Sequence, residues 1–466
     1  MLKRVRIILT VLLLLAAVGL DAQVTTASMA GKVTDASNEP IIGATVQAVH
    51  QPSGSRYGTV TNVDGRYSIQ GMRTGGPYRV EISYIGYQTV IYKDITLQLG
   101  EVYNLNVEMS ESSELLNEVI VTAAKTKFTA EKTGATTNIS SAQITQLPTV
   151  NRSISDIARL SPYANGMSFA GGDGRSTNFT IDGANFNNNF GLSSNLPGGG
   201  NPISMDAIEE VQVVVAPFDV RQTNFIGGGI NAITKSGTNT FRGTAYTYYR
   251  NQDMRGNRIN GEDLGARSDE SKTTYGFTLG GPIIKNKLFF FVNYEKEKTP
   301  GEVIKYRARE DGEDAKGMVS RTLKSDMEKV YNHLKDKYGY DAGSYTNFPA
   351  DEENTKLLAR IDWNITDRHR LSLRYNNTKN TAWNAPNGNS SDTGYRLNNT
   401  YRVGTQSMAF ANSMYSMDNK VQSWAADLNS RFTDKISNQL LFTYTNIEDM
   451  RGTNSSPFPF IDIMAG

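Results

Sequence analysis

The chain has 466 residues, well above the roughly 100 to 200 of a typical domain, so several domains are expected. Its 48 Lys and Arg balance 47 Asp and Glu, and a formal charge of +1 argues against a nucleic-acid partner, which would select a basic excess. There is no Cys, which excludes disulfides, thiolate metal sites and Cys nucleophiles, while 23 Tyr and 42 Gly favour β structure with many turns.

Residues 1–22 are predicted to be a signal peptide. Three basic residues precede an almost wholly apolar run at 7–20, and Ala22 offers a small-residue cleavage point. The alternative is a membrane anchor. The apolar run of about 14 residues is, however, shorter than the roughly 20 that a spanning helix needs.

Residues 24–110 are predicted to form a small all-β domain, a sandwich of about seven strands. Short β-branched runs recur at 44–49, 78–84 and 102–109. Asn62-Val63-Asp64-Gly65 is a strong hairpin signal, because Asp-Gly tolerates the positive φ that tight turns require.

Four runs within this region follow one known pattern. They are Gly31–Asp35, Pro40–Val46, Thr61–Tyr67 and Ile82–Tyr87. Together they resemble a carboxypeptidase-regulatory-like domain, with a transthyretin- or Ig-like fold. The resemblance implies a non-catalytic domain, and His50 alone supplies no metal cluster. Such domains commonly precede outer-membrane receptors of the Bacteroidetes-type lineage.

Residues 111–124 are a polar linker that ends in an extended, β-branched segment. The segment consists of Glu118, Val119, Ile120, Val121, Thr122 and Ala123. It is either an ordinary strand or a strand that adds to the sheet edge of a partner through backbone hydrogen bonds. It resembles the TonB box of TonB-dependent receptors. The resemblance implies that these residues bind TonB, which acts with an inner-membrane energising complex.

Residues 125–240 carry four further runs that belong together. Arg152–Leu160 has Ile154, Ile157 and Leu160 at helical spacing, and the other runs are Asn178–Gly183, Ile208–Val214 and Gly227–Gly237. They resemble the plug domain of TonB-dependent receptors, a mixed α+β domain whose first helix would be 152–160.

A second pattern lies within the last of these runs. Gly229 with Lys235 and Ser236 looks like a phosphate-binding loop, but Thr234 stands where such a loop has Gly. Nucleotide binding is therefore not expected. The glycines are interpreted as positions where the backbone packs closely.

From residue 241 onward, apolar and polar residues alternate with period two, as at 274–280, 357–365 and 424–432. A soluble sandwich would show the same alternation. Connection lengths favour an outer-membrane barrel, because short periplasmic turns alternate with long external loops in that fold. Short connections are predicted at 282–287, 366–369 and 433–437, and long ones at 251–272, 299–354 and 381–420.

About seven strands are predicted in residues 241–466, against the roughly 22 of plugged outer-membrane transporters. Because open sheet edges are not tolerated in lipid, we expect the N-terminal part of a longer receptor with an incomplete antiparallel barrel. One long connection is predicted to carry a helix between Asp314 and Tyr338. Its shared face would contain Val319, Leu323, Met327, Val330 and Leu334.

The apical stretch of the plug is the candidate ligand contact. It comprises Asn185, Phe186, Asn187, Asn188, Asn189 and Phe190, with Pro197–Asn201 beside it. Amides offer donors and acceptors without charge, and Phe offers a stacking surface. The alternative is a polar loop that binds nothing.

The resemblance covers nearly all of the mature chain and is closest to the Oar-like branch of TonB-dependent receptors. It implies a mainly-β protein of a Gram-negative, Bacteroidetes-like outer membrane, in contact with its lipid. Such a protein binds an extracellular ligand and imports it with energy from TonB, without a cofactor. A signalling or surface-interaction protein and a SusC-like glycan importer are the alternatives. No catalytic residue is proposed, since the three His are scattered and no nucleophile elbow is present.

Overall fold

The computed structural model describes most of the chain. The described residues are 24–111, 119–122, 135–149, 151–188, 195–215, 222, 226–256, 258–263, 270–301, 306–346, 350–385 and 403–463. The predicted signal peptide lies outside them, as do Glu118, Ala123, Asn189 and Phe190. Among the residues that the structure describes, no helix has the length and apolar character needed to cross a membrane.

The N-terminal domain is a β-sandwich. One sheet contains β1 (Ala27–Asp35), β4 (Arg66–Met72), β7 (Val102–Asn104) and β8 (Val107–Met109). The other has the order β3 (Ser55–Val60), β2 (Thr45–His50), β5 (Gly75–Ser83), β6 (Val90–Leu97) and β9 (Val119–Thr122). Alternate residues such as Met29, Val46 and Ile82 are fully buried between the sheets. Each such side chain stabilises the fold by about 1.5–3 kcal/mol.

The turn at Asn62–Gly65 exists, but the predicted hairpin is wrong. The Asn62 side chain accepts hydrogen bonds from the backbone N–H groups of Asp64 and Arg66, and Gly65 has a φ of 71°. However, β3 pairs with β2, whereas β4 pairs with β1 in the opposite sheet. The turn therefore carries the chain from one sheet to the other, because its local chemistry does not choose a partner strand.

The segment that resembles a TonB box continues the sandwich. Its strand β9 runs parallel to β6, with Val119 opposite Val90 and Thr122 opposite Lys93. It thus forms the last strand of the second sheet.

The plug domain follows in the described residues from 135 onward. Its main sheet has the order β10 (Ala135–Ser140), β15 (Ile208–Val215), β16 (Gly228–Thr234), β13 (Asn178–Ile181) and β14 (Ala184–Asn185). Shorter elements are α2 (Ser141–Gln146), α3 (Ile154–Ala158), the pair β11 (Ala164–Asn165) and β12 (Ser168–Phe169), and the 3-10 turns η1 (Gly174–Ser176) and η2 (Met205–Ala207). The core gathers Ile139, Ile157, Phe179, Val213 and Ile230.

The predicted first helix of the plug is only partly correct. Helix α3 covers Ile154 and Ile157, both buried, but it ends at Ala158, and Leu160 lies beyond it with 42% exposure. A preceding helix, α2, was not predicted. It is one short segment with a single buried apolar residue, Ile144, so it lacks a periodic signal.

The C-terminal part is one seven-stranded antiparallel sheet, here called the wall sheet. Its order is β17 (Arg242–Asn251), β20 (Ser271–Ile284), β21 (Leu288–Thr299), β24 (Glu352–Asn364), β25 (His369–Asn384), β26 (Tyr415–Arg431) and β27 (Ser437–Gly452). The long connections contain η3 (Gln252–Met254), β18 (Arg258–Ile259), β19 (Glu262–Asp263), β22 (Arg307–Arg309), β23 (Val319–Leu323), α4 (Lys324–Tyr338) and η4 (Ala411–Ser413).

The helix predicted between Asp314 and Tyr338 begins later than expected. Val319–Leu323 is a strand that pairs in parallel with β22, and the helix starts at Lys324. Pairing with a neighbouring strand has overridden the helical spacing in this segment. The end agrees with the prediction, because Gly339 in the left-handed region terminates the helix.

The wall sheet is apolar outside and polar inside. Phe277, Trp363 and Phe442 are 44%, 45% and 64% exposed on one face. On the other face, Asn293, Asp362 and Thr378 are at most 1% exposed. A soluble sandwich buries its apolar face, so this arrangement is that of a membrane barrel. The predicted mainly-β fold class, with a sandwich, a plug and part of a barrel, is confirmed.

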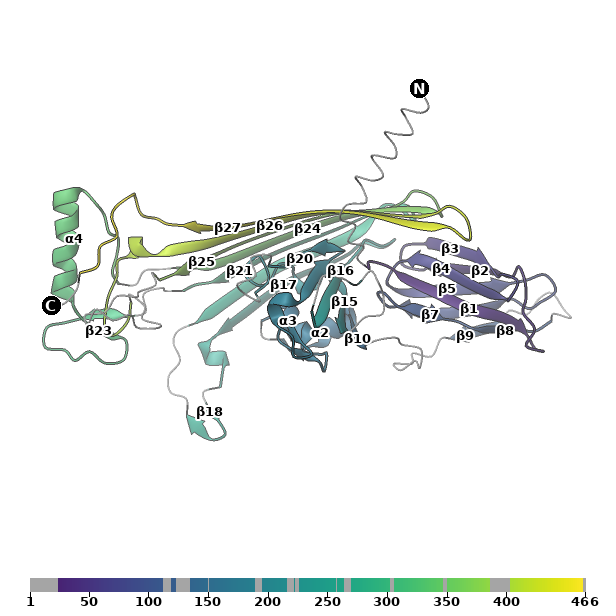
Figure 1. The fold of residues 1–466 in the computed structure, drawn as a ribbon, viewed down its shortest axis with the longest axis horizontal. Helices are drawn as coiled ribbons and strands as arrows, with labels where there is room; N and C mark the ends of the chain where they lie inside the picture. Colours follow the sequence, from purple (N-terminus) through teal and green to yellow (C-terminus); the bar gives the residue numbers. More distant parts are fainter. Residues whose placement is uncertain are drawn as a thin grey trace, which may run out of the picture.

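The three parts are stacked along the wall sheet. Figure 1 shows the plug against one face of the sheet, the N-terminal domain at one end, and α4 with β23 at the opposite end. The domain meets the ends of the wall strands at their short turns. Asn364 Nδ2 donates to Ser55 Oγ at 3.0 Å, and the Arg370 guanidinium lies 3.8 Å from the centre of the Tyr57 ring.

Candidate functional site

The junction between plug and wall sheet is organised around Asp182. Its carboxylate accepts hydrogen bonds from the backbone N–H and the hydroxyl of Thr234, at 3.0 and 2.6 Å. It also lies 3.7 Å from Arg360 Nη1 and 3.6 Å from Arg374 Nε, and all of these groups are buried. One plug carboxylate thus ties the β13–β14 turn and the end of β16 to two neighbouring strands of the wall.

Local backbone geometry places Asp182 there. It has a φ of 50°, and Gly183 follows with a φ of 80°. Asp and Gly tolerate this left-handed region better than other residues, so the pair allows the tight turn between β13 and β14. The turn directs the carboxylate at the wall sheet.

Arg360 links the plug to the rest of the network. Its Nε and Nη2 donate to the two oxygens of Asp362 at 2.8 and 2.9 Å, and its Nη1 donates to the Thr234 carbonyl at 2.7 Å. Asp362 also lies 3.6 Å from Arg73 of the N-terminal domain. Buried charges need such pairing, because an isolated one is strongly disfavoured by loss of hydration. Plug, wall and N-terminal domain therefore share one ionic network.

A second buried cluster lies further along the wall. The Lys356 ammonium, with a side chain 1% exposed, pairs with Glu295 at 2.9 Å and also with Glu297. Glu295 in turn accepts hydrogen bonds from Ser204 of the plug at 2.8 Å and from Tyr246 of β17 at 2.9 Å. The plug is therefore held to the wall at two separate points by groups that can separate only with rehydration.

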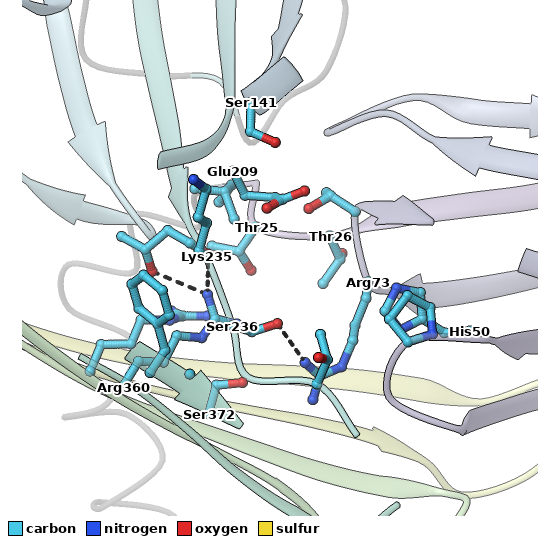
Figure 2. Close-up of a pocket in the computed structure, with 18 of the residues that line it drawn as sticks. Thr25, Thr26, His50, Arg73, Ser141, Glu209, Lys235, Ser236, Arg360 and Ser372 are labelled. Atoms are coloured by element: carbon cyan, nitrogen blue, oxygen red, sulfur yellow. Dashed lines mark hydrogen bonds between the residues drawn. The ribbon is translucent and has the colours of Figure 1, made fainter. Parts of the chain in front are cut away.

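A cavity of about 410 Å³ lies where the three parts meet. Figure 2 shows Arg73 and His50 of the N-terminal domain facing Glu209, Ser236 and Arg360, with Arg73 donating to Ser236. Burial raises the pKa of Glu209, and burial beside Arg73 lowers the pKa of His50 to about 3.

The residues that resemble a phosphate-binding loop do not form one in the structure. Gly229 lies within strand β16, whereas Lys235 and Ser236 follow that strand and line the cavity. In the described parts of the chain, no group of His, Asp and Glu is arranged to hold a metal ion.

Part of the predicted ligand stretch contributes to the plug itself. Phe186 is 1% exposed and packs against Phe179, with the ring centres 6.4 Å apart. Asn187 accepts a hydrogen bond from the backbone N–H of Phe179 at 2.6 Å and donates to Asn178. In this conformation Phe186 is a core residue, while Asn185 and Asn188 are half-buried. Ligand contact by this stretch stays a prediction, and Asn189 and Phe190 lie outside the described residues.

The predicted TonB-binding segment lies in the N-terminal domain, at the end of its second sheet. The backbone of Val119, Ile120, Val121 and Thr122 forms β9 on the N-terminal domain, while Glu118 and Ala123 lie outside the described residues. TonB binding by these six residues therefore also stays a prediction.

Asp182, Lys356, Arg360 and Arg374 were not identified from the sequence. For the three basic residues a signal was present, because they are charged residues at inward positions of the alternating strands β24 and β25. What was missing was their partner, since Asp182 lies 192 positions from Arg374 in the chain.

Comparisons with known proteins agree with this architecture. Residues 28–110 match the carboxypeptidase regulatory-like domain, and residues 233–303 match an outer membrane beta barrel domain. The chain is 25% identical over 376 residues to the TonB-dependent transporter Oar of Myxococcus xanthus, covering 75% of this chain and 33% of that transporter.

The solved structures that match include a siderophore receptor and an outer membrane transporter. The siderophore receptor PirA from Pseudomonas aeruginosa has a TM-score of 0.43 at 15% identity, covering 69% of this chain and 42% of the receptor. The outer membrane transporter YddB from Escherichia coli has a TM-score of 0.48 at 15% identity, covering 69% and 40%. The chain is thus similar in sequence to a TonB-dependent transporter, and it carries an N-terminal carboxypeptidase regulatory-like domain and part of an outer membrane beta barrel domain.

Proposed function

We propose that the chain provides the recognition and coupling parts of an outer-membrane transporter that imports an extracellular ligand with energy from TonB. The observation that carries the proposal is the plug held on the polar face of the wall sheet by buried ion pairs. An apolar outer face suits lipid, and a polar inner face filled by a separate domain suits a gated passage.

The ionic contacts explain why such a passage would need energy. Separating Asp182 from Arg360 and Arg374 leaves buried charges without partners, and breaking one buried pair destabilises a protein by about 3–5 kcal/mol. Ligand binding moves the plug only by its different affinity for the two plug positions. A pull on the chain between the N-terminal domain and the plug would supply the remaining work.

We further propose that the pull enters through Val119–Thr122. Support comes from the position of this β-branched strand directly ahead of the plug, and from its extended backbone, which can pair with a strand of a partner. Ligand contact is assigned to the apical stretch at 185–190, through Asn185 and Asn188 rather than the buried Phe186.

The experiment is a Val121→Pro substitution in the full-length protein. Proline removes a backbone donor and disrupts strand pairing, so we expect cross-linking to TonB and ligand uptake to fall together, with surface ligand binding unchanged. A Ser113→Pro variant in the same linker is the matched control. Wild-type cross-linking and uptake in Val121→Pro would contradict the assignment.

A further inference from the structure

Among the strands that the structure describes, β9 is paired along one edge only. It pairs in parallel with β6 over four residues, and it ends the sheet order β3-β2-β5-β6-β9. Alternate residues of a strand direct their N–H and C=O groups to opposite edges. Pairing with β6 therefore uses only part of the backbone groups of β9, and no strand in the described part of the chain pairs with the far edge.

We propose that the N-terminal domain is itself part of the TonB-binding surface. It holds Val119–Thr122 as a preformed edge strand, and a strand of TonB adds to the open edge, so that β6, β9 and TonB form one continuous sheet. This inference rests on the proposed TonB coupling and assigns the platform on which that coupling occurs.

Pre-ordering favours addition over displacement. A free linker must be fixed into a strand when TonB binds, and the lost backbone entropy weakens binding. On β6 this ordering has already occurred. The domain also contacts the short-turn end of the wall sheet through Asn364 and Arg370, the end predicted to face the periplasm. The open edge is thus presented on the side where TonB acts.

Lys93 is the residue through which this arrangement can be tested. The pairing of β5 with β6 shifts register between Tyr92 and Ile95, so Lys93 has no partner on β5, whereas it pairs with Thr122 on β9. Its side chain is exposed. A change at Lys93 therefore affects the β9 edge with little effect on the core of the sandwich.

The first experiment locks β9 in place. The chain has no Cys, so Lys93→Cys with Thr122→Cys creates a unique pair. Residues opposite each other on adjacent strands have Cα spacings within disulfide range. Binding of the purified periplasmic domain of TonB to the whole chain in detergent is then measured with the disulfide formed and reduced.

We expect the oxidised protein to bind at least as tightly as the same protein reduced. Loss of binding on oxidation, recovered with reductant, would mean that β9 must leave the domain, and would overturn the proposal. Failure of the disulfide to form under oxidising conditions would overturn it as well, because β9 would not lie on β6.

The second experiment removes the platform and keeps the segment. Lys93→Pro deletes a backbone donor on β6, and Lys93→Ala is the matched control that keeps it. We expect Lys93→Pro to weaken TonB binding by about tenfold through lost pre-ordering, with Lys93→Ala unchanged. Equal affinity of both variants would overturn the platform. The underlying TonB coupling has a different test. It would be overturned if the wild-type protein did not bind TonB and Val121→Pro left cross-linking and ligand uptake unchanged.

Discussion

Removal of the Asp182 carboxylate tests whether buried ion pairs hold the plug. Asp182→Ala deletes the acceptor for both hydrogen bonds from Thr234 and the counter-charge near Arg360 and Arg374. Asp182→Asn keeps an acceptor and suits the left-handed backbone, but it removes the charge. The two variants therefore separate hydrogen bonding from charge at one position.

The expected magnitudes follow from what each variant leaves behind. Arg360 keeps Asp362, and Arg374 keeps a contact with Asp427 at 3.7 Å, so neither arginine loses every partner. The Ala variant still leaves buried donors and positive charge under-compensated, and we expect plug stability to fall by about 3–5 kcal/mol. For the Asn variant we expect about 1–3 kcal/mol, the penalty for an incompletely satisfied buried group.

The assay uses a fluorophore on a unique Cys. Tyr163 of the plug is 51% exposed, so Tyr163→Cys places a label where the core is not disturbed. Urea titration then reports plug release, with Asp314→Ala as a control, because the Asp314–Lys316 pair is solvent-exposed and such pairs contribute about 0–1 kcal/mol. A destabilisation by Asp182→Ala no larger than that of the control would refute the role of the network.

Three further predictions concern other buried groups. The pKa of His50 is about 3 in the folded protein against 6.5 in the unfolded chain, so only the unfolded state takes up a proton between these values. Stability of the N-terminal domain should therefore be complete above pH 6.5 and fall by about 2 kcal/mol at pH 5. Hydrogen exchange in β2 and β5 measures this loss, which should vanish in His50→Gln. Lys356→Met leaves Glu295 without its buried cation, so the urea midpoint of the wall, followed by Trp fluorescence, should drop by the equivalent of about 3–5 kcal/mol, and Glu295→Gln in addition should restore part of it. Phe186→Ala should destabilise the plug by about 3–5 kcal/mol in the labelled protein, and a value below about 1 kcal/mol would show that Phe186 is not a core residue.

Period-two alternation was enough to predict the strands of the wall, but not which face is buried. Trp363 points outward and Asp362 points inward, which is the reverse of a soluble sheet. The alternating sequence pattern is the same for a soluble sheet and for a membrane barrel. The connection lengths supplied the missing information, because short and long connections alternate regularly only when they lie at opposite ends of a barrel.

Local signals failed where a distant segment decided the outcome. The Asp64-Gly65 turn was correct, yet its flanking strands pair in different sheets. Val319 and Leu323 do have helical spacing, yet their segment forms a strand that pairs with β22. In both cases the local conformation could be predicted, whereas the partner could not.

The ionic network shows the same limit for the candidate site. Asp182 was included in a plug motif, but its role depends on Arg360 and Arg374, which come from another part of the chain. Inward charged positions on alternating strands are the signal to examine in such sequences. Which carboxylate meets which arginine follows only from the register of the wall strands against the plug.

The contacts of the N-terminal domain also imply an order of assembly. The sandwich completes its two main sheets and core from residues 27–109, plus the added strand β9, so it can fold soon after it emerges. Its Thr25, however, donates to Asp427 at 2.7 Å, a partner 402 residues later, and Gln439 donates to the same threonine. These contacts close a very long loop and can form only after β26 and β27 have been made. The first domain to fold is thus among the last to be fixed in position.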